Sequence, residues 1–78
     1  MAELTEYCLV RIIKLLRPID QYNGWNVNQR PPQTGDTGTL IEILHAPNLP
    51  NDYVVESVGT DGAPIWLSDF SLDEIEPI

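Results

Sequence analysis

The sequence of 78 residues predicts a mainly β domain. Two segments, residues 37–44 and 53–58, are rich in β-branched and aromatic residues, as strands are. The pair Asp61-Gly62 follows the second segment and is typical of a tight hairpin. A chain of this length has room for one small domain, which buries only about 60% of the surface that the unfolded chain exposes. We therefore expect a single domain over residues 1–78.

The first apolar segment, residues 7–16, has two interpretations. As a strand it places Val10 and Ile12 on one face. Placed on a helix, residues 3–17 gather their charged side chains on one side and several aliphatic ones on the other. The Val-Arg-Ile-Ile cluster and Pro18, just beyond the segment, favour the strand. We expect a strand here, with the helix as the alternative.

A long loop is expected over residues 18–36, which are rich in Asn, Gln, Gly and Pro. Loops of this length in small domains are often binding elements. The two adjacent prolines at its end favour an extended backbone. Four apolar side chains are available to anchor it: Ile19, Tyr22, Trp25 and Val27.

The second half of the chain reads as strands joined by short connections. A turn rich in Pro, Asn and Asp separates residues 37–44 from the strand at 53–58, and residues 64–67 form the return strand of the hairpin. Ser71 and Glu74 have the spacing of a capping box and predict one helical turn. Residues 74–78 then form a short closing strand.

A sheet of this size cannot be covered on both faces by so short a chain, so we expect it to close into a small barrel. The first and last strands would meet in that barrel and form cross-strand ion pairs. The basic residues expected there are Arg11, Lys14 and Arg17, and the acidic ones are Asp73, Glu74 and Glu76.

Three stretches resemble parts of SH3-like small barrels, including those of the KOW type. GDTGTLIEIL is similar to the glycine-bracketed strand of KOW domains, YVVESVGTDGAPIWL to their central hairpin, and SDFSLDEIEPI to the helical turn and closing strand of SH3-like domains. The chain is also similar to short bacterial proteins of no assigned function. The resemblance implies an SH3-like barrel of about five short strands with a long first loop and one helical turn before the last strand. It implies no particular function, because small barrels host many unrelated activities.

The charge balance favours some partners over others. Twelve acidic and four basic residues give a net charge of −8, which repels phosphate backbones and anionic lipids and attracts cationic surfaces. A single cysteine excludes an intramolecular disulfide and fits a reducing cytoplasm. No apolar run is long enough to cross a membrane, and the N-terminus lacks the basic start of a secretory signal. We expect a soluble cytoplasmic protein.

The Gly-Asp-Thr-Gly stretch at residues 35–38 is not a phosphate-binding loop, because no Lys-Ser or Lys-Thr pair and no helix follows it. A nucleic-acid clamp of the same spacing would join two helices and carry nearby lysines. We interpret Gly35 and Gly38 as structural residues that permit a positive φ or a bulge where the chain enters the sheet.

Catalytic and metal chemistry have little support in the sequence. Cys8 lies in an apolar run and His45 is the sole imidazole, so no activated nucleophile is indicated. The acidic cluster of Asp69, Asp73, Glu74 and Glu76 lacks the spacing of a calcium loop. We interpret this cluster as a charged edge that discourages association with other chains. The alternative is that it binds a divalent cation or a basic partner surface. We expect no cofactor, no metal and no enzymatic activity.

The sequence therefore favours a non-catalytic acidic protein-interaction module, either an accessory subunit or an immunity or antitoxin-like protein. Its partner would be a protein with a basic or proline-rich surface. Trp66 and Phe70 fit a core or rim position, whereas Trp25 stands alone in a polar loop. The alternative is a KOW-type nucleic-acid-binding module that uses the few basic residues, Arg11, Lys14, Arg17 and Arg30. The candidate partner-binding residues are Tyr22, Trp25, Arg30, Trp66, Asp69, Asp73 and Glu74.

Overall fold

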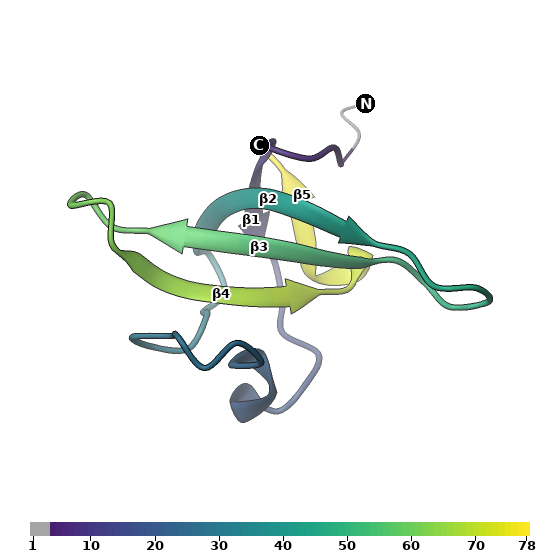
Figure 1. Cartoon of the computed structure of the whole chain (residues 1–78), viewed down its shortest axis with the longest axis horizontal. Helices are drawn as coiled ribbons and strands as arrows, with labels where there is room; N and C mark the ends of the chain where they lie inside the picture. Colours follow the sequence, from purple (N-terminus) through teal and green to yellow (C-terminus); the bar gives the residue numbers. More distant parts are fainter. Residues whose placement is uncertain (1–3) are drawn as a thin grey trace.

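The computed structural model describes residues 4–78, which form five antiparallel strands and two 3-10 turns (Figure 1). The mainly β fold class is confirmed, as are the long first loop and the helical turn before the last strand. The strands are β1 (Leu9–Ile12), β2 (Thr37–Leu44), β3 (Asp52–Val58), β4 (Pro64–Phe70) and β5 (Ile75–Pro77). The turns are η1 (Ile19–Tyr22) and η2 (Leu72–Glu74).

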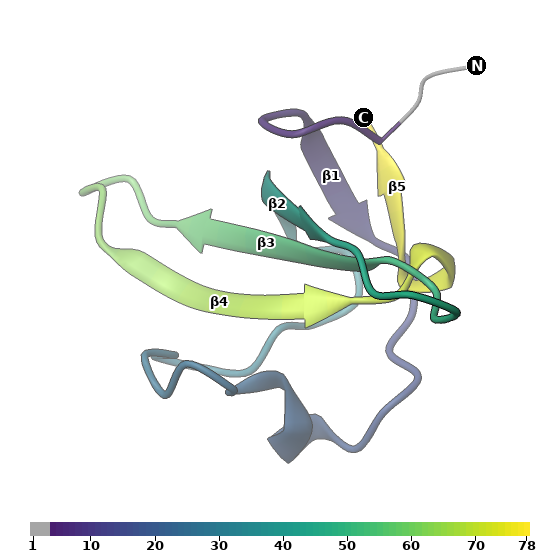
Figure 2. The same ribbon diagram turned by 45° about the vertical axis from the view of Figure 1, so that its right-hand side comes forward.

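The strands form one sheet in the order β4-β3-β2-β1-β5. Strand β2 is shared between two layers: its first residues pair with β1, and the rest pair with β3. The register shifts between Leu40 and Glu42, and such a bulge bends a strand. Figure 2 shows the result, with β1 and β5 running across the layer of β2, β3 and β4. The core lies between these layers.

The sheet is not closed, so the expectation of a closed barrel was wrong. The first and last strands do meet, with Arg11 opposite Glu76, but β4 and β5 remain the two edges. Strand β5 has three residues and includes Pro77, which has no N–H to donate to a further strand. The outer edge of β4 is occupied by the 18–36 loop, as described below.

The first apolar segment is a strand rather than a helix, although only four of its residues are in β1. Val10 and Ile12 are buried, whereas the alternating residues Leu9 and Arg11 are exposed. Residue 3, where the alternative helix would begin, lies outside the described part of the chain. Strand β4 runs to Phe70, three residues past its expected end, because the alternation of buried side chains continues that far.

The core combines aromatic side chains from β3, β4 and the first loop with aliphatic ones from β1, β2, β3 and β5. The rings of Trp66 and Phe70 form a T-shaped pair at a centroid distance of 5.6 Å, and both side chains are fully buried, as expected. Each buried side chain of this size contributes about 1.5–3 kcal/mol to folding. The aliphatic members are Val10, Ile12, Leu40, Val55 and Ile75.

The two glycines at the start of β2, one before the strand and one within it, serve different purposes. Gly35 has a φ of +94°, which confirms the expected turn into the sheet. Gly38 does not need a positive φ; instead, a Cβ there would lie 2.7 Å from the backbone oxygen of Glu56 and 2.8 Å from a methyl of Val55. Strand β3 passes over Gly38 too closely for any side chain.

Candidate functional site

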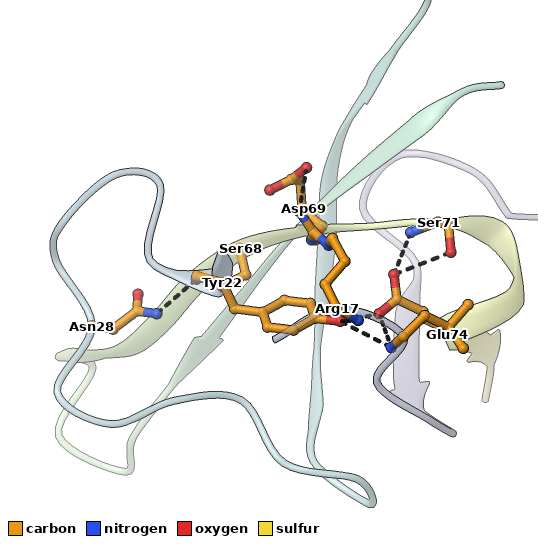
Figure 3. Close-up of polar contacts among 8 residues, drawn as sticks. Arg17, Tyr22, Asn28, Ser68, Asp69, Ser71 and Glu74 are labelled. Atoms are coloured by element: carbon orange, nitrogen blue, oxygen red, sulfur yellow. Dashed lines mark hydrogen bonds and ion pairs between the residues drawn. The ribbon is translucent and has the colours of Figure 1, made fainter. Parts of the chain in front are cut away.

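The 18–36 loop is attached to the rest of the fold by Tyr22, whose side chain is fully buried. Its ring stacks on Phe70 at a centroid distance of 5.5 Å. Its hydroxyl accepts hydrogen bonds from the backbone N–H groups of Leu16 (3.1 Å) and Arg17 (3.0 Å), and donates one to the carboxylate of Glu74 (Figure 3). Burial and the bond to this carboxylate raise the pKa of Tyr22, so the hydroxyl keeps its proton.

Glu74 is the acceptor at the centre of this network and is 1% exposed. The Ser71 N–H (2.9 Å) and hydroxyl (3.1 Å) donate to one carboxylate oxygen, and the Leu16 N–H (3.0 Å) and Tyr22 hydroxyl donate to the other. Burial alone would raise the pKa of Glu74, but these donors outweigh it and hold the pKa below its usual value. The capping box predicted from Ser71 and Glu74 is therefore present, with an ionised glutamate inside the protein.

The return arm of the loop lies along the outer edge of β4 (Figure 3). The Asn28 side chain donates to the Tyr22 carbonyl (2.9 Å) and accepts from the Leu67 N–H (2.9 Å). The Gln29 N–H donates to the Ile65 carbonyl (2.8 Å). These contacts take up backbone groups that an edge strand would otherwise offer to another chain. A partner must therefore contact this side of the sheet through the loop.

The far end of the loop is fixed by Asp36. Its carboxylate accepts two hydrogen bonds from the Arg30 guanidinium (2.7 and 3.2 Å), one from the Gln33 N–H (3.0 Å) and one from the Trp66 indole N–H (3.0 Å). Burial would raise the pKa of Asp36, but the bonds from Arg30, Gln33 and Trp66 lower it overall. Arg30 and Trp66 are thus brought together through a residue that the sequence analysis had not selected as a site residue.

Between these anchors the loop displays apolar side chains. Ile19, Trp25 and Val27 are 50%, 44% and 50% exposed. Asn26, between the last two, has a φ of +58°, a conformation that asparagine tolerates better than most residues. A hollow of about 360 Å³ lies between the two arms of the loop. It is lined by Ile19, Asp20, Asn23, Asn28, Gln29, Arg30 and Pro31.

A second polar cluster lies where Arg17 crosses the edge of β4. The Arg17 guanidinium donates to the Asp69 carbonyl, lies 3.7 Å from the Asp69 carboxylate and sits 4.4 Å from the centre of the Tyr22 ring. Asp52 lies on the neighbouring strand β3. Burial and the interaction with the Asp69 carboxylate raise the pKa of Asp52 to about 7.

The seven candidate residues are thus divided between the interior and the surface. Tyr22, Trp66 and Glu74 are buried, so their side chains hold the loop in place. Trp25 is on the loop surface, and Arg30 lines the hollow.

Asp69 is paired with Arg17, and Asp73 is exposed on η2. Of the expected charge pairs between the first and last strands, Arg11 and Glu76 form one at 3.2 Å. Arg17 pairs with Asp69 instead of with the C-terminal residues. The backbone N–H of Lys14 donates to the backbone carbonyl of Glu74 (3.5 Å).

Sequence reasoning missed Arg17, Asn28 and Asp36 as residues that position the loop. Asn28 could not be distinguished by sequence from the other asparagines around it. Asp36 offered one signal, a carboxylate beside the turn glycine Gly35, because Asp often accepts backbone hydrogen bonds in turns. Its bond to Trp66 joins residues 30 positions apart, and no local pattern indicates it.

Comparison with known proteins found no matching family model, no similar curated protein and no similar solved structure. Within residues 4–78, no helix is long and apolar enough to cross a membrane. The same part of the chain has no group of three or more His, Cys, Asp or Glu side chains placed to hold a metal ion.

Proposed function

We propose that this protein is a non-catalytic, cytoplasmic protein-interaction module, and that its contact surface is the outer side of the 18–36 loop. We also propose that the fold is an open variant of the SH3-like small barrel. The long first loop, the pairing of the last strand with the first and the single turn before that last strand all support this assignment.

The observation that carries the proposal is a loop fixed from within that exposes apolar side chains. Tyr22, Asn28 and Asp36 hold it through hydrogen bonds to the sheet and to η2. A loop already fixed in place loses little conformational entropy when a partner binds. Trp25 is 44% exposed, and tryptophan is among the residues that contribute most to binding at protein interfaces.

The distribution of charge supports a partner with a basic or proline-rich surface. Three of the four basic side chains are in ion pairs, so they do not offset the remaining acidic ones. The strand register directs several carboxylates to the same outer face of β2, β3 and β4, which would steer a cationic partner toward the protein. They are Glu42, Asp52 and Glu56; Asp69 lies on the same face but is paired with Arg17.

Two biological versions fit this proposal: an accessory subunit, and an immunity or antitoxin-like protein that covers a cationic site. The nucleic-acid alternative would depend on Arg11, Lys14, Arg17 and Arg30. Because three of these already bind carboxylates, few cations remain to displace counter-ions from a phosphate backbone. The protein-partner version is therefore favoured.

The test is affinity capture of the partner from host extract, followed by calorimetry with purified components. Trp25→Ala should weaken binding by about tenfold or more, as expected for a tryptophan at the centre of an interface. Leu49→Ala is the control: Leu49 is 66% exposed on the β2–β3 connection, away from the loop, and its removal should change the affinity by less than about twofold. Equal affinities for wild type and Trp25→Ala, or RNA binding at low salt, would contradict the proposal.

A further inference from the structure

The hollow between the two arms of the loop has a feature that the proposed function does not explain: its charge is unbalanced. Of its lining residues, Arg30 is the cation, and its guanidinium is already bound through both terminal nitrogens to Asp36. Asp20 also lines the hollow, is exposed and forms no ion pair within residues 4–78. The uncompensated charge in the hollow is therefore negative.

The remaining lining combines apolar surface with amide side chains. Ile19 is half exposed, Pro31 is exposed, and Asn23 and Gln29 provide neutral polar groups. An occupant that fits all of these needs an apolar stem and a cationic end. A side chain with those properties packs its methylene groups on apolar surface while its charge meets a carboxylate. Arginine matches best, because its planar guanidinium binds carboxylates through two hydrogen bonds.

We infer that this hollow is the pocket for an arginine side chain of the protein partner, with Asp20 as the charge that receives the guanidinium and Ile19 and Pro31 as the surface for its stem. This inference rests on the proposed function and makes it specific. The same loop exposes Trp25 and Val27, so the partner would present a basic residue together with apolar contacts.

The volume and the rigidity of the hollow agree with this occupant. About 360 Å³ is at the lower end of the range for small-ligand pockets, so it has room for one long side chain rather than for a large ligand. Both arms are fixed: Asn28 bonds to Tyr22 and Leu67, and the Gln29 N–H bonds to Ile65. The pocket therefore exists before the partner arrives. An anionic ligand would meet Asp20 and a guanidinium already neutralised by Asp36.

The test uses a defined probe, the peptide acetyl-Gly-Pro-Arg-Pro-Gly-amide, added to the 15N-labelled protein and followed by NMR. A peptide with citrulline in place of arginine has the same shape without the charge. We expect the arginine peptide to shift the amide resonances of residues 19–23 and 28–30, and the citrulline peptide to leave them in place. Asp20→Asn should weaken binding of the arginine peptide by about tenfold or more, the effect of losing a charge-assisted hydrogen bond.

The matched control is Glu42→Gln, which removes one negative charge from the outer face of β2, where Glu42 lies opposite Val54. It should leave the peptide affinity within about twofold of wild type. Equal binding of the citrulline peptide, equal effects of the two substitutions, or shifts confined to β2, β3 and β4 would overturn the inference. Binding of the captured partner to the two variants distinguishes failure of the arginine pocket from failure of the proposed function. If Trp25→Ala loses the partner but Asp20→Asn does not, the arginine pocket is wrong and the interaction module stands.

Discussion

Replacement of Glu74 by glutamine gives the sharpest test of how the loop is held. The wild-type carboxylate accepts hydrogen bonds from the Ser71 N–H and hydroxyl, the Leu16 N–H and the Tyr22 hydroxyl. An amide of the same shape keeps one acceptor oxygen and places an NH2 group against the donors at the other position. Two charge-assisted bonds are lost, and buried donors are left facing another donor.

We expect this change to lower the free energy of unfolding by about 3 kcal/mol, since each bond to a buried charged group contributes roughly 1.5–3 kcal/mol and the losses are not additive. A domain of this size loses roughly 4–8 °C of Tm per kcal/mol, so the melting temperature should fall by about 12–24 °C. Because the folded-state pKa of Glu74 is lowered, its stabilisation is present above the unfolded pKa of about 4.3 and is lost as the pH falls through the folded value. The Glu74→Gln variant should therefore lack this part of the loss of stability at low pH.

Urea denaturation over a range of pH measures both effects. The control is Glu76→Gln, because Glu76 is two residues away in a half-exposed ion pair with Arg11 that contributes at most about 1 kcal/mol. The buried carboxylate does not hold the loop if Glu74→Gln and Glu76→Gln lower the free energy of unfolding by the same amount. The same conclusion follows if the Glu74 variant keeps the full pH dependence of wild-type stability.

Three further outcomes follow from the same structure. The raised pKa of Asp52 makes the stability of the wild-type protein fall as the pH rises from about 4 to about 7. Asp52→Asn should lack that fall, so its free energy of unfolding should exceed that of the wild type by about 1 kcal/mol at a pH of about 8. Urea titrations at both ends of this pH range measure the difference. Gly38→Ala should cost about 1–3 kcal/mol through its clash with β3, whereas Gly24→Ala, which has open space, should cost far less; an equal loss in thermal melts would refute the close approach. Asn28→Ala should speed hydrogen exchange at the Leu67 N–H by about tenfold or more, and unchanged exchange would show that the loop does not protect the edge of β4.

Local patterns in the sequence were enough to predict most of the strands. β2 covers the predicted residues 37–44, and the Asp61-Gly62 turn lies between β3 and β4, with Gly62 at a φ of +82°. The spacing of Ser71 and Glu74 predicted the capping box. These features depend on residues close together in the chain, so composition and periodicity carry them.

Contacts between distant residues explain what the sequence could not predict. Tyr22 and Glu74 are 52 positions apart, and neither the polar loop nor the acidic tail indicates that they meet inside the protein. The same holds for closure of the sheet, which was expected from size alone. The loop covers the edge of β4 and thereby removes the need for β4 to pair with β5. Of the candidate site, Trp25 and Arg30 were identifiable, but the hollow that Arg30 lines depends on how the loop folds back.

A chemical-shift map of the 15N-labelled protein bound to its captured partner tests whether the 18–36 loop is the contact surface. We expect the largest changes on residues 18–36, including the indole N–H of Trp25, with little change at the β2–β3 and β3–β4 connections. Changes confined to those connections or to the outer face of the sheet, with the Trp25 indole resonance unmoved, would contradict this expectation.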